Sequence, residues 1–230
     1  RDLHSFPTRR SSDLIDGNGE FMGSNRLACL LLEYFLNTRT VRGPVCRSVS
    51  TTHNLDRIAR QNGLAVIETK VGFKYISKSL RENGCIMGVE ESGGLSIIGH
   101  VPEKDGILVG LLAAEMLAAT GKTFDELSQE IDDKYGMMVN ERVDIKITPQ
   151  EKGRLLADLT EYQPKSIAAT AVDTIDATDG KKIILEDGSW ILIRASQTEP
   201  VIRVFTEAAD KSRMAEMRLE VMTALSLTVK

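Results

Sequence analysis

Between residues 45 and 135 the sequence alternates short apolar stretches with helix-like ones, and this alternation constrains the fold more than any other feature. Each strand-like stretch precedes a segment of helical spacing, namely Val45–Thr51 before a helix ending at Gly63, Leu64–Thr69 before Phe73–Leu80, and Cys85–Val89 before a long helix from Ile107. Such alternation predicts a mostly parallel sheet layered with helices, a three-layer α/β fold. Ligands of these sheets bind at the carboxyl ends of the strands.

The pattern changes near residue 140, where runs of strand replace the alternation. The expected elements are a strand over Glu141–Ile147, a helix that begins with Thr148, Pro149 and Glu151, a hairpin of Lys181–Glu186 with Ser189–Arg194, a strand over Val201–Glu207, and a last helix capped by Asp210. We therefore predict two domains, an α/β domain over 39–139 and an α+β domain over 140–230.

The first residues differ from both domains. His4 to Leu14 resembles one reading frame of a sequencing-library adapter. A disordered leader and a mitochondrial targeting signal are the alternatives, the latter weakened by the lack of an amphipathic helical pattern. We interpret residues 1–14 as a non-native leader and expect the native chain to start near Ile15.

Composition narrows the classes of partner. The chain has 42% hydrophobic and 27% charged residues, a net charge of −4 and a pI near 5.5. Without a basic excess it is not expected to bind nucleic acid, although small anions can still be held by a few local cations. Three widely spaced cysteines indicate neither a disulfide framework nor a zinc site, which favours the cytoplasm. The most apolar stretch, Ile107 to Ala119, contains Glu115, is too short to cross a membrane, and is expected to be a buried helix.

A loop of chemically useful residues follows the apolar run that ends at Val89. Glu90-Glu91-Ser92-Gly93-Gly94 supplies carboxylates, a hydroxyl and two glycines that permit close backbone approach. Carboxylates bind sugar hydroxyls, but taken by itself this loop is more simply explained as an exposed acidic turn. Downstream, His100 and Lys104 precede Asp105, which we expect to be the N-cap of the long helix.

A second loop carries anion-binding groups. Arg194-Ala195-Ser196-Gln197-Thr198-Glu199-Pro200 lies between two expected strands, and Arg203 follows in the second of them. Two guanidinium groups, two hydroxyls and loop N–H groups match the donors that a phosphate dianion needs. A plain strand connection would need neither the arginines nor the hydroxyls.

Together these segments resemble the α-D-phosphohexomutase superfamily, the phosphoglucomutase/phosphomannomutase enzymes. Four motifs occur in that family's order: Thr69–Lys74 as T-x-V-G-x-K, Glu90–Gly94 as the sugar loop, His100–Gly106 as H-x-x-E-K-D-G, and Arg194–Arg203 as the phosphate loop. The resemblance implies a third and a fourth family domain here, with residues 15–38 left from the second.

The resemblance also implies a function for named residues. Such enzymes interconvert hexose 1-phosphate and hexose 6-phosphate through a 1,6-bisphosphate. The substrate-binding residues implied are Glu90, Ser92, Lys104, Lys74 and, more weakly, Arg47, with Lys104 and His100 near the transferred phosphoryl group. The phosphate-binding residues implied are Arg194, Ser196, Gln197, Thr198 and Arg203.

The sequence departs from the family in two ways. Val89 and Gln197 stand where the family has glycine, so phosphate affinity can differ. Neither the phosphoserine motif nor the D-G-D-G-D magnesium loop occurs, so no complete catalytic set and no metal ligands are expected here. Mg²⁺ and a hexose 1,6-bisphosphate activator would belong to the full-length enzyme. We expect an inactive fragment that binds hexose phosphates; a stand-alone, non-catalytic sugar-phosphate-binding protein is the alternative.

Overall fold

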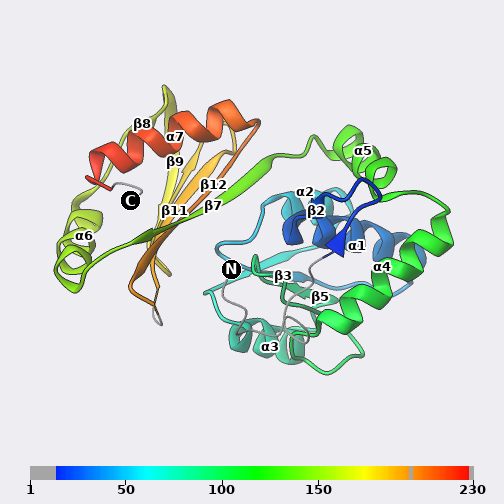
Figure 1. Cartoon of the computed structure of the whole chain (residues 1–230). Coiled ribbons are helices and arrows are strands. Elements are labelled where there is room, and N and C mark those ends of the chain that lie inside the picture. Colours follow the sequence, from blue (N-terminus) through cyan, green and yellow to red (C-terminus); the bar gives the residue numbers. More distant parts are fainter. Residues whose placement is uncertain (1–13, 197–198, 228–230) are drawn as a thin grey trace. The chain divides into compact units, whose positions relative to one another are not determined.

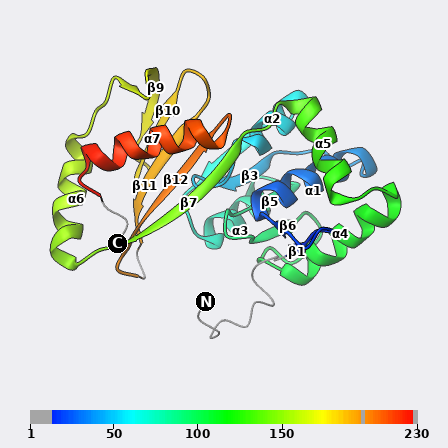
Figure 2. The same ribbon diagram turned by 45° about the horizontal axis from the view of Figure 1, so that its top comes forward.

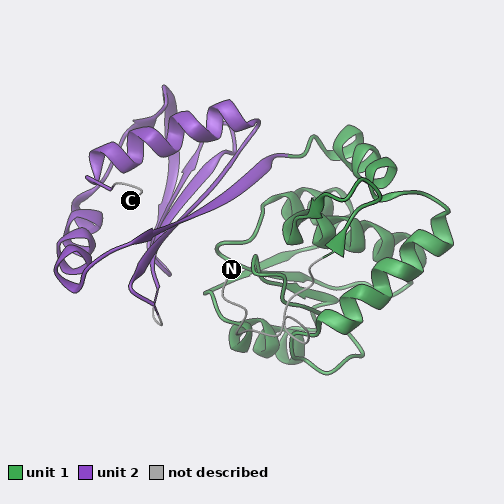
Figure 3. Ribbon diagram, in the orientation of Figure 1, with its two compact units in different colours: residues 1–137 green, residues 138–230 purple. Residues whose placement is uncertain are grey.

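The computed structural model describes residues 14–196 and 199–227, and the leader expected over residues 1–14 lies almost wholly outside them. The chain divides into two compact units, residues 1–137 and 138–230 (Figure 3). This division falls two residues before the predicted boundary between 139 and 140. Each unit has its own apolar core.

Unit 1 is built on a four-stranded sheet in the order β4-β3-β5-β6. Its strands are β3 (Val45–Ser48), β4 (Val66–Thr69), β5 (Met87–Val89) and β6 (Leu95–Ile97). β3 pairs in parallel with β4 and β5, whereas the edge strand β6 is antiparallel to β5. The predicted mostly parallel α/β fold is confirmed.

Helices cover both faces of this sheet, as the alternation predicted. The helices are α1 (Ser24–Thr38), α2 (Asn54–Gln61), α3 (Phe73–Glu82), α4 (Gly106–Thr120) and α5 (Phe124–Tyr135). Figure 1 shows α3 on one side of β3 and β5, with α1 and α2 on the other. Successive residues of β3 point to opposite faces, so Val45 joins the core with α1 and α2 while Cys46 joins the core with α3.

Helix α1 follows a short hairpin of β1 (Leu14–Ile15) and β2 (Phe21–Met22), whose turn is closed by the carboxylate of Asp16. The sequence interpretation grouped residues 15–38 with a preceding domain. In the structure α1 buries most of its apolar side chains in the core of unit 1. The sequence interpretation and the structure differ here because an amphipathic pattern shows that a helix packs on a core, but it does not show which core.

Helix α4 was expected to be buried, but the structure buries only one side of it. Val109, Leu112, Ala113 and Met116 face the core, whereas Ile107 and Leu111 are more than half exposed. Among the described residues no single helix is long and apolar enough to cross a membrane. Only α4 and α5 taken together, with a bend of 84° between them, reach that length and composition.

Unit 2 is a six-stranded antiparallel sheet in the order β7-β12-β11-β10-β9-β8, with two helices on one face. The elements are β7 (Val139–Lys146), α6 (Pro149–Glu161), β8 (Ser166–Ile167), β9 (Thr170–Asp176), β10 (Lys181–Leu185), β11 (Trp190–Ala195), β12 (Val201–Ala208) and α7 (Lys211–Ala224). Figure 2 shows α6 and α7 beside this sheet. The predicted α+β fold is confirmed, including inward-facing Met214, Met217, Val221 and Leu225.

Candidate functional site

The loop after β5 folds back on itself at the carboxyl end of the sheet. The N–H of Glu90 donates to the carbonyl of Gly94 (2.7 Å), and the N–H of Gly93 donates to the carbonyl of Glu90 (3.0 Å). Gly93 has φ of +88°, which favours glycine. At Gly94 a Cβ would lie 3.0 Å from Cδ of Lys104 and 3.2 Å from Oε2 of Glu90, so a side chain would crowd both.

The Glu90 carboxylate joins three of the motifs that the sequence singled out. Glu90 is only 5% exposed. Its Oε1 accepts a hydrogen bond from the N–H of Gly72 (2.8 Å), and its Oε2 lies 3.5 Å from Nζ of Lys104. The Lys104 ammonium also lies 6.0 Å from the centre of the Phe73 ring. The motifs near residues 70, 90 and 104 therefore meet at the Glu90 carboxylate.

The hydroxyl and the histidine of this region lie at its margin. Ser92 is exposed at the tip of the loop. His100 Nε2 lies 3.1 Å from Oδ2 of Asp105, whose Oδ1 caps α4 by accepting from the N–H groups of Ile107 and Leu108. Burial alone would raise the pKa of the Asp105 carboxyl, but its hydrogen bonds to Leu108 and His100 outweigh burial and lower it. The predicted N-cap is confirmed, and His100 is held by that cap.

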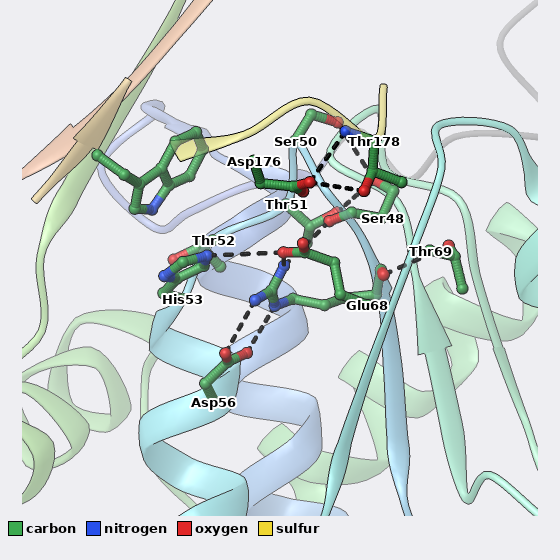
Figure 4. Close-up of polar contacts among 12 residues, drawn as sticks. Ser48, Ser50, Thr51, Thr52, His53, Asp56, Glu68, Thr69, Asp176 and Thr178 are labelled. Atoms are coloured by element: carbon green, nitrogen blue, oxygen red, sulfur yellow. Dashed lines mark hydrogen bonds and ion pairs between the residues drawn. The ribbon is translucent and has the colours of Figure 1, made fainter. Parts of the chain in front are cut away.

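The two remaining basic candidates lie in other surroundings. Lys74 is exposed, with its ammonium 4.9 Å from the centre of the Tyr75 ring. Arg47 is 3% exposed and forms a two-point ion pair with Asp56, Nε to Oδ1 at 2.5 Å and Nη2 to Oδ2 at 2.8 Å. Its Nη1 donates to Glu68. Figure 4 shows Asp56 on α2 and the Glu68 carboxylate turned toward this guanidinium group.

The Arg47 network changes how that residue is interpreted. Burial would lower the pKa of the guanidinium, but Asp56 and Glu68 outweigh burial and raise it, so the group stays charged. A guanidinium bound by two carboxylates has few donors left for a sugar. The contacts therefore support a structural role for Arg47, which ties β3 to α2 and β4, in place of the substrate contact that was expected.

A hydroxyl cluster near the same sheet edge was missed by sequence reasoning. The Ser48 hydroxyl lies 2.8 Å from that of Thr51 and 3.2 Å from that of Ser50. Thr51 Oγ1 is 3.5 Å from the carbonyl oxygen of Val89, the last residue before the Glu90 loop. A signal for this cluster was present in the sequence, because four of the five residues at positions 48–52 carry hydroxyls. These residues lie at the carboxyl end of β3, where ligands of parallel sheets bind.

In unit 2 the two arginines of the second loop are cross-strand neighbours. Arg194 of β11 lies directly opposite Arg203 of β12 in the register, so both side chains leave the same face of the sheet. Arg203 in turn lies opposite Asp144 of β7. Gly180, with φ of +98°, precedes β10 and leaves room for Arg194, because a Cβ there would be 3.1 Å from Cβ of Arg194.

The guanidinium groups are paired by charge but incompletely hydrogen-bonded. Arg194 Nε lies 3.0 Å from Oδ1 of Asp179, and Arg203 forms ion pairs with Asp144 and Glu199. Among the described residues neither Arg194 Nε nor Arg203 Nε has a hydrogen-bond partner of acceptable geometry, although both atoms are buried. Buried donors of this kind require an explanation, and an anionic ligand is one.

Ser196 is the described hydroxyl of this loop. Its N–H donates to the carbonyl of Val201 (2.9 Å), and its Oγ accepts from the N–H of Glu199 (3.2 Å). Gln197 and Thr198, the other two expected phosphate contacts, lie outside the described residues.

Comparison with known proteins places both units in one family. Residues 23–135 match "phosphoglucomutase/phosphomannomutase, alpha/beta/alpha domain III", and residues 138–224 match the C-terminal domain of the same family. The chain is 34% identical over 202 residues to a phosphoglucomutase/phosphomannomutase of Thermococcus kodakarensis, covering 88% of this chain and 42% of that protein.

Two further relatives agree. A phosphoglucosamine mutase of Clavibacter michiganensis is 35% identical over 165 residues, covering 72% of this chain and 33% of that protein. A crystal structure from Thermus thermophilus, assigned as a phosphomannomutase, superimposes with a TM-score of 0.77 at 26% identity and covers 97% of this chain and 47% of that one. The chain spans less than half the length of these relatives.

Proposed function

Because the chain belongs to the phosphoglucomutase/phosphomannomutase family, we propose that it supplies the sugar-binding and phosphate-binding loops of an enzyme that interconverts hexose 1-phosphate and hexose 6-phosphate. The reaction of the whole enzyme proceeds in this proposal through a hexose 1,6-bisphosphate. A hexose phosphate is the ligand of this chain. Some relatives are named as phosphoglucosamine mutases, so amino-hexose phosphates should be tested as ligands as well.

The observation that carries the proposal is the arginine pair of unit 2. Arg194 and Arg203 stand side by side on adjacent strands, and each has a buried Nε–H without a hydrogen-bond partner among the described residues. A phosphate dianion offers acceptor oxygens in the spacing that guanidinium groups bind best. Ser196 lies in the same loop. Unit 2 would thus hold the phosphate group that does not react.

Unit 1 would bind the sugar hydroxyls. A buried carboxylate has about four lone-pair sites, and at Glu90 the described contacts are the Gly72 N–H and the Lys104 ammonium. Sugar hydroxyls can donate to the remaining sites, with the exposed Ser92 hydroxyl as a further partner. Lys104 keeps two of its three N–H donors for a ligand oxygen, and His100 stands close by on the cap of α4.

The transfer step needs groups beyond these loops. Positioning and electrostatic stabilisation account for most of the catalysis of phosphoryl transfer, but a nucleophile is still required. Among residues 14–196 and 199–227 no three His, Cys, Asp or Glu side chains are grouped so that they could hold a metal ion. Because neither the phosphoserine motif nor the D-G-D-G-D magnesium loop of the family occurs in the sequence, we propose that these 230 residues alone do not catalyse the reaction.

Calorimetric titration of glucose 6-phosphate into the 230-residue chain and its Arg203→Ala variant tests the proposal. Binding by the wild type that the variant loses is expected, and equal affinities would remove the arginine pair from the site. An assay with glucose 1-phosphate and glucose 1,6-bisphosphate tests the second claim, since turnover above background would overturn it. The upstream reading frame decides between the mutase and a stand-alone sugar-phosphate-binding protein.

A further inference from the structure

Helix α6 begins beside the phosphate loop of unit 2, and the helix and the residues just before it contact both ends of the loop between β11 and β12. The N–H of Ile147, two residues before α6, donates to the carbonyl of Pro200 (3.0 Å). Lys152, in the first turn of α6, donates from Nζ to the carbonyl of Ser196 (2.9 Å). The loop between β11 and β12 is therefore anchored at its start and at its end to one short segment, residues 147–152.

The charge of Lys152 is not neutralised by a carboxylate. Its only hydrogen bond within the described part of the chain is to a neutral carbonyl oxygen, and no ion pair joins it there. The neighbouring Glu151 is engaged elsewhere, because its side chain accepts from the N–H of Thr148 in the capping box that starts α6. By contrast, Arg194 and Arg203 each lie in an ion pair with acidic side chains.

This difference matters for an anion because attraction depends on the net charge near it. Two arginines surrounded by Asp144, Asp179 and Glu199 contribute donors, but their charge is largely balanced. Lys152 is half-buried, where a charge is screened less by water and salt than on the open surface. The amino end of α6 adds the partial positive charge of a helix terminus.

We propose that Lys152 is a positioning residue of the phosphate loop and supplies the unbalanced positive charge that draws a phosphate group to it. The lysine acts through the Ser196 carbonyl, which it fixes relative to α6, and through its charge. It need not touch the ligand. The inference rests on the proposed function, since it concerns the same phosphate group.

The test compares four variants with the wild-type chain by calorimetric titration with glucose 6-phosphate and, separately, inorganic phosphate. Lys152→Met removes the hydrogen bond and the charge, Lys152→Gln keeps a donor for the Ser196 carbonyl without charge, and Lys152→Arg keeps both. Lys165→Met is the matched control, because Lys165 is an exposed lysine that lies outside the loop and its anchoring segment. Thermal melting of each variant checks that it folds.

We expect Lys152→Met to bind both ligands about tenfold more weakly, as for the loss of a charged hydrogen bond, with Lys152→Gln weakened less. Lys152→Arg should largely restore binding, and Lys165→Met should bind like the wild type. Affinity should also fall less steeply with salt in Lys152→Met and Lys152→Gln, a change that a purely structural role would not produce.

The outcomes separate the two claims. Suppose that the wild type binds and that Lys152→Gln and Lys152→Met bind with the same affinity and salt dependence. This result would overturn the role of Lys152 and leave the proposed function intact. Weak binding by Lys152→Arg equal to that of Lys152→Met would also overturn it. A wild-type chain that binds neither glucose 6-phosphate nor phosphate would overturn both.

Discussion

Lys104 Nζ lies 3.5 Å from Oε2 of Glu90, and this ion pair connects two segments that the sequence separates by fourteen positions. The pair lies where the carboxyl end of β5 meets the start of α4. Glu90 is nearly buried, so it depends on Lys104 and on the Gly72 N–H for its favourable environment. The first prediction follows from this dependence.

Glu90→Gln should weaken binding of hexose phosphates while leaving the fold intact. Glutamine can still accept from the Gly72 N–H, but it loses the charge that attracts Lys104 and strengthens hydrogen bonds from sugar hydroxyls. A loss of about tenfold in affinity is expected from calorimetric titration, as for one charged hydrogen bond. Glu82→Gln, on the exposed end of α3, is the control and should bind normally. Unchanged affinity in Glu90→Gln would remove Glu90 from the sugar site.

Asp56→Asn should destabilise unit 1 more than any surface change nearby. It breaks the two-point contact with Arg47 and leaves a buried guanidinium with less compensation, at a cost of about 3 kcal/mol. Arg60→Gln removes the exposed partner of the same carboxylate and should cost about 0.5 kcal/mol or less. Urea denaturation measures both, and equal effects would contradict the structural role given to Arg47.

Acid should destabilise unit 1 through the same carboxylate. Burial alone would raise the pKa of Asp56, but the hydrogen bond and charge of Arg47 outweigh burial and lower it. A lowered folded pKa means that the stabilisation is complete above the unfolded value, roughly 4, and is lost as the pH falls through the folded value. Urea unfolding free energies from about pH 7 down to about pH 2.5 should therefore decrease, and less so in Asp56→Asn. If the free energy of unfolding falls equally with pH in the wild type and in Asp56→Asn, Asp56 is not the source of the acid destabilisation.

Much of the fold was predictable because local patterns determine it. The helix caps at Asp105, Thr148 and Asp210 and the hairpin around residue 187 all occur as expected. Strand β9 was missed because it lies near the sheet edge and its polar and apolar residues do not alternate regularly. Pairings that depend on tertiary packing, such as Arg47 with Asp56, leave no local signal. Lys152 was missed for the same reason, since its partner lies 44 positions away.

Gly180→Ala should disturb the phosphate loop from outside it. Gly180 has φ of +98°, and a Cβ there would lie 2.6 Å from the carbonyl oxygen of Ile193 and 3.1 Å from Cβ of Arg194. The substitution should destabilise unit 2 by about 2 kcal/mol and weaken phosphate binding by displacing Arg194. Gly153→Ala is a matched control, because a Cβ in that exposed helical position meets nothing within 4 Å and should stabilise α6 by up to about 1 kcal/mol. Equal melting temperatures of the two variants would contradict this account.

The central claim is that the Glu90 loop binds the hydroxyls of a hexose phosphate and that the Arg194–Arg203 loop binds a phosphate group. Nuclear magnetic resonance of the ¹⁵N-labelled chain tests it most directly, with amide signals of Gly93 and Gly94 reporting on one loop and those of Ala195 and Ser196 on the other. Glucose 6-phosphate should shift both sets, whereas inorganic phosphate should shift only the second. Shifts confined to other parts of the chain, or no shifts with glucose 6-phosphate, would contradict the claim.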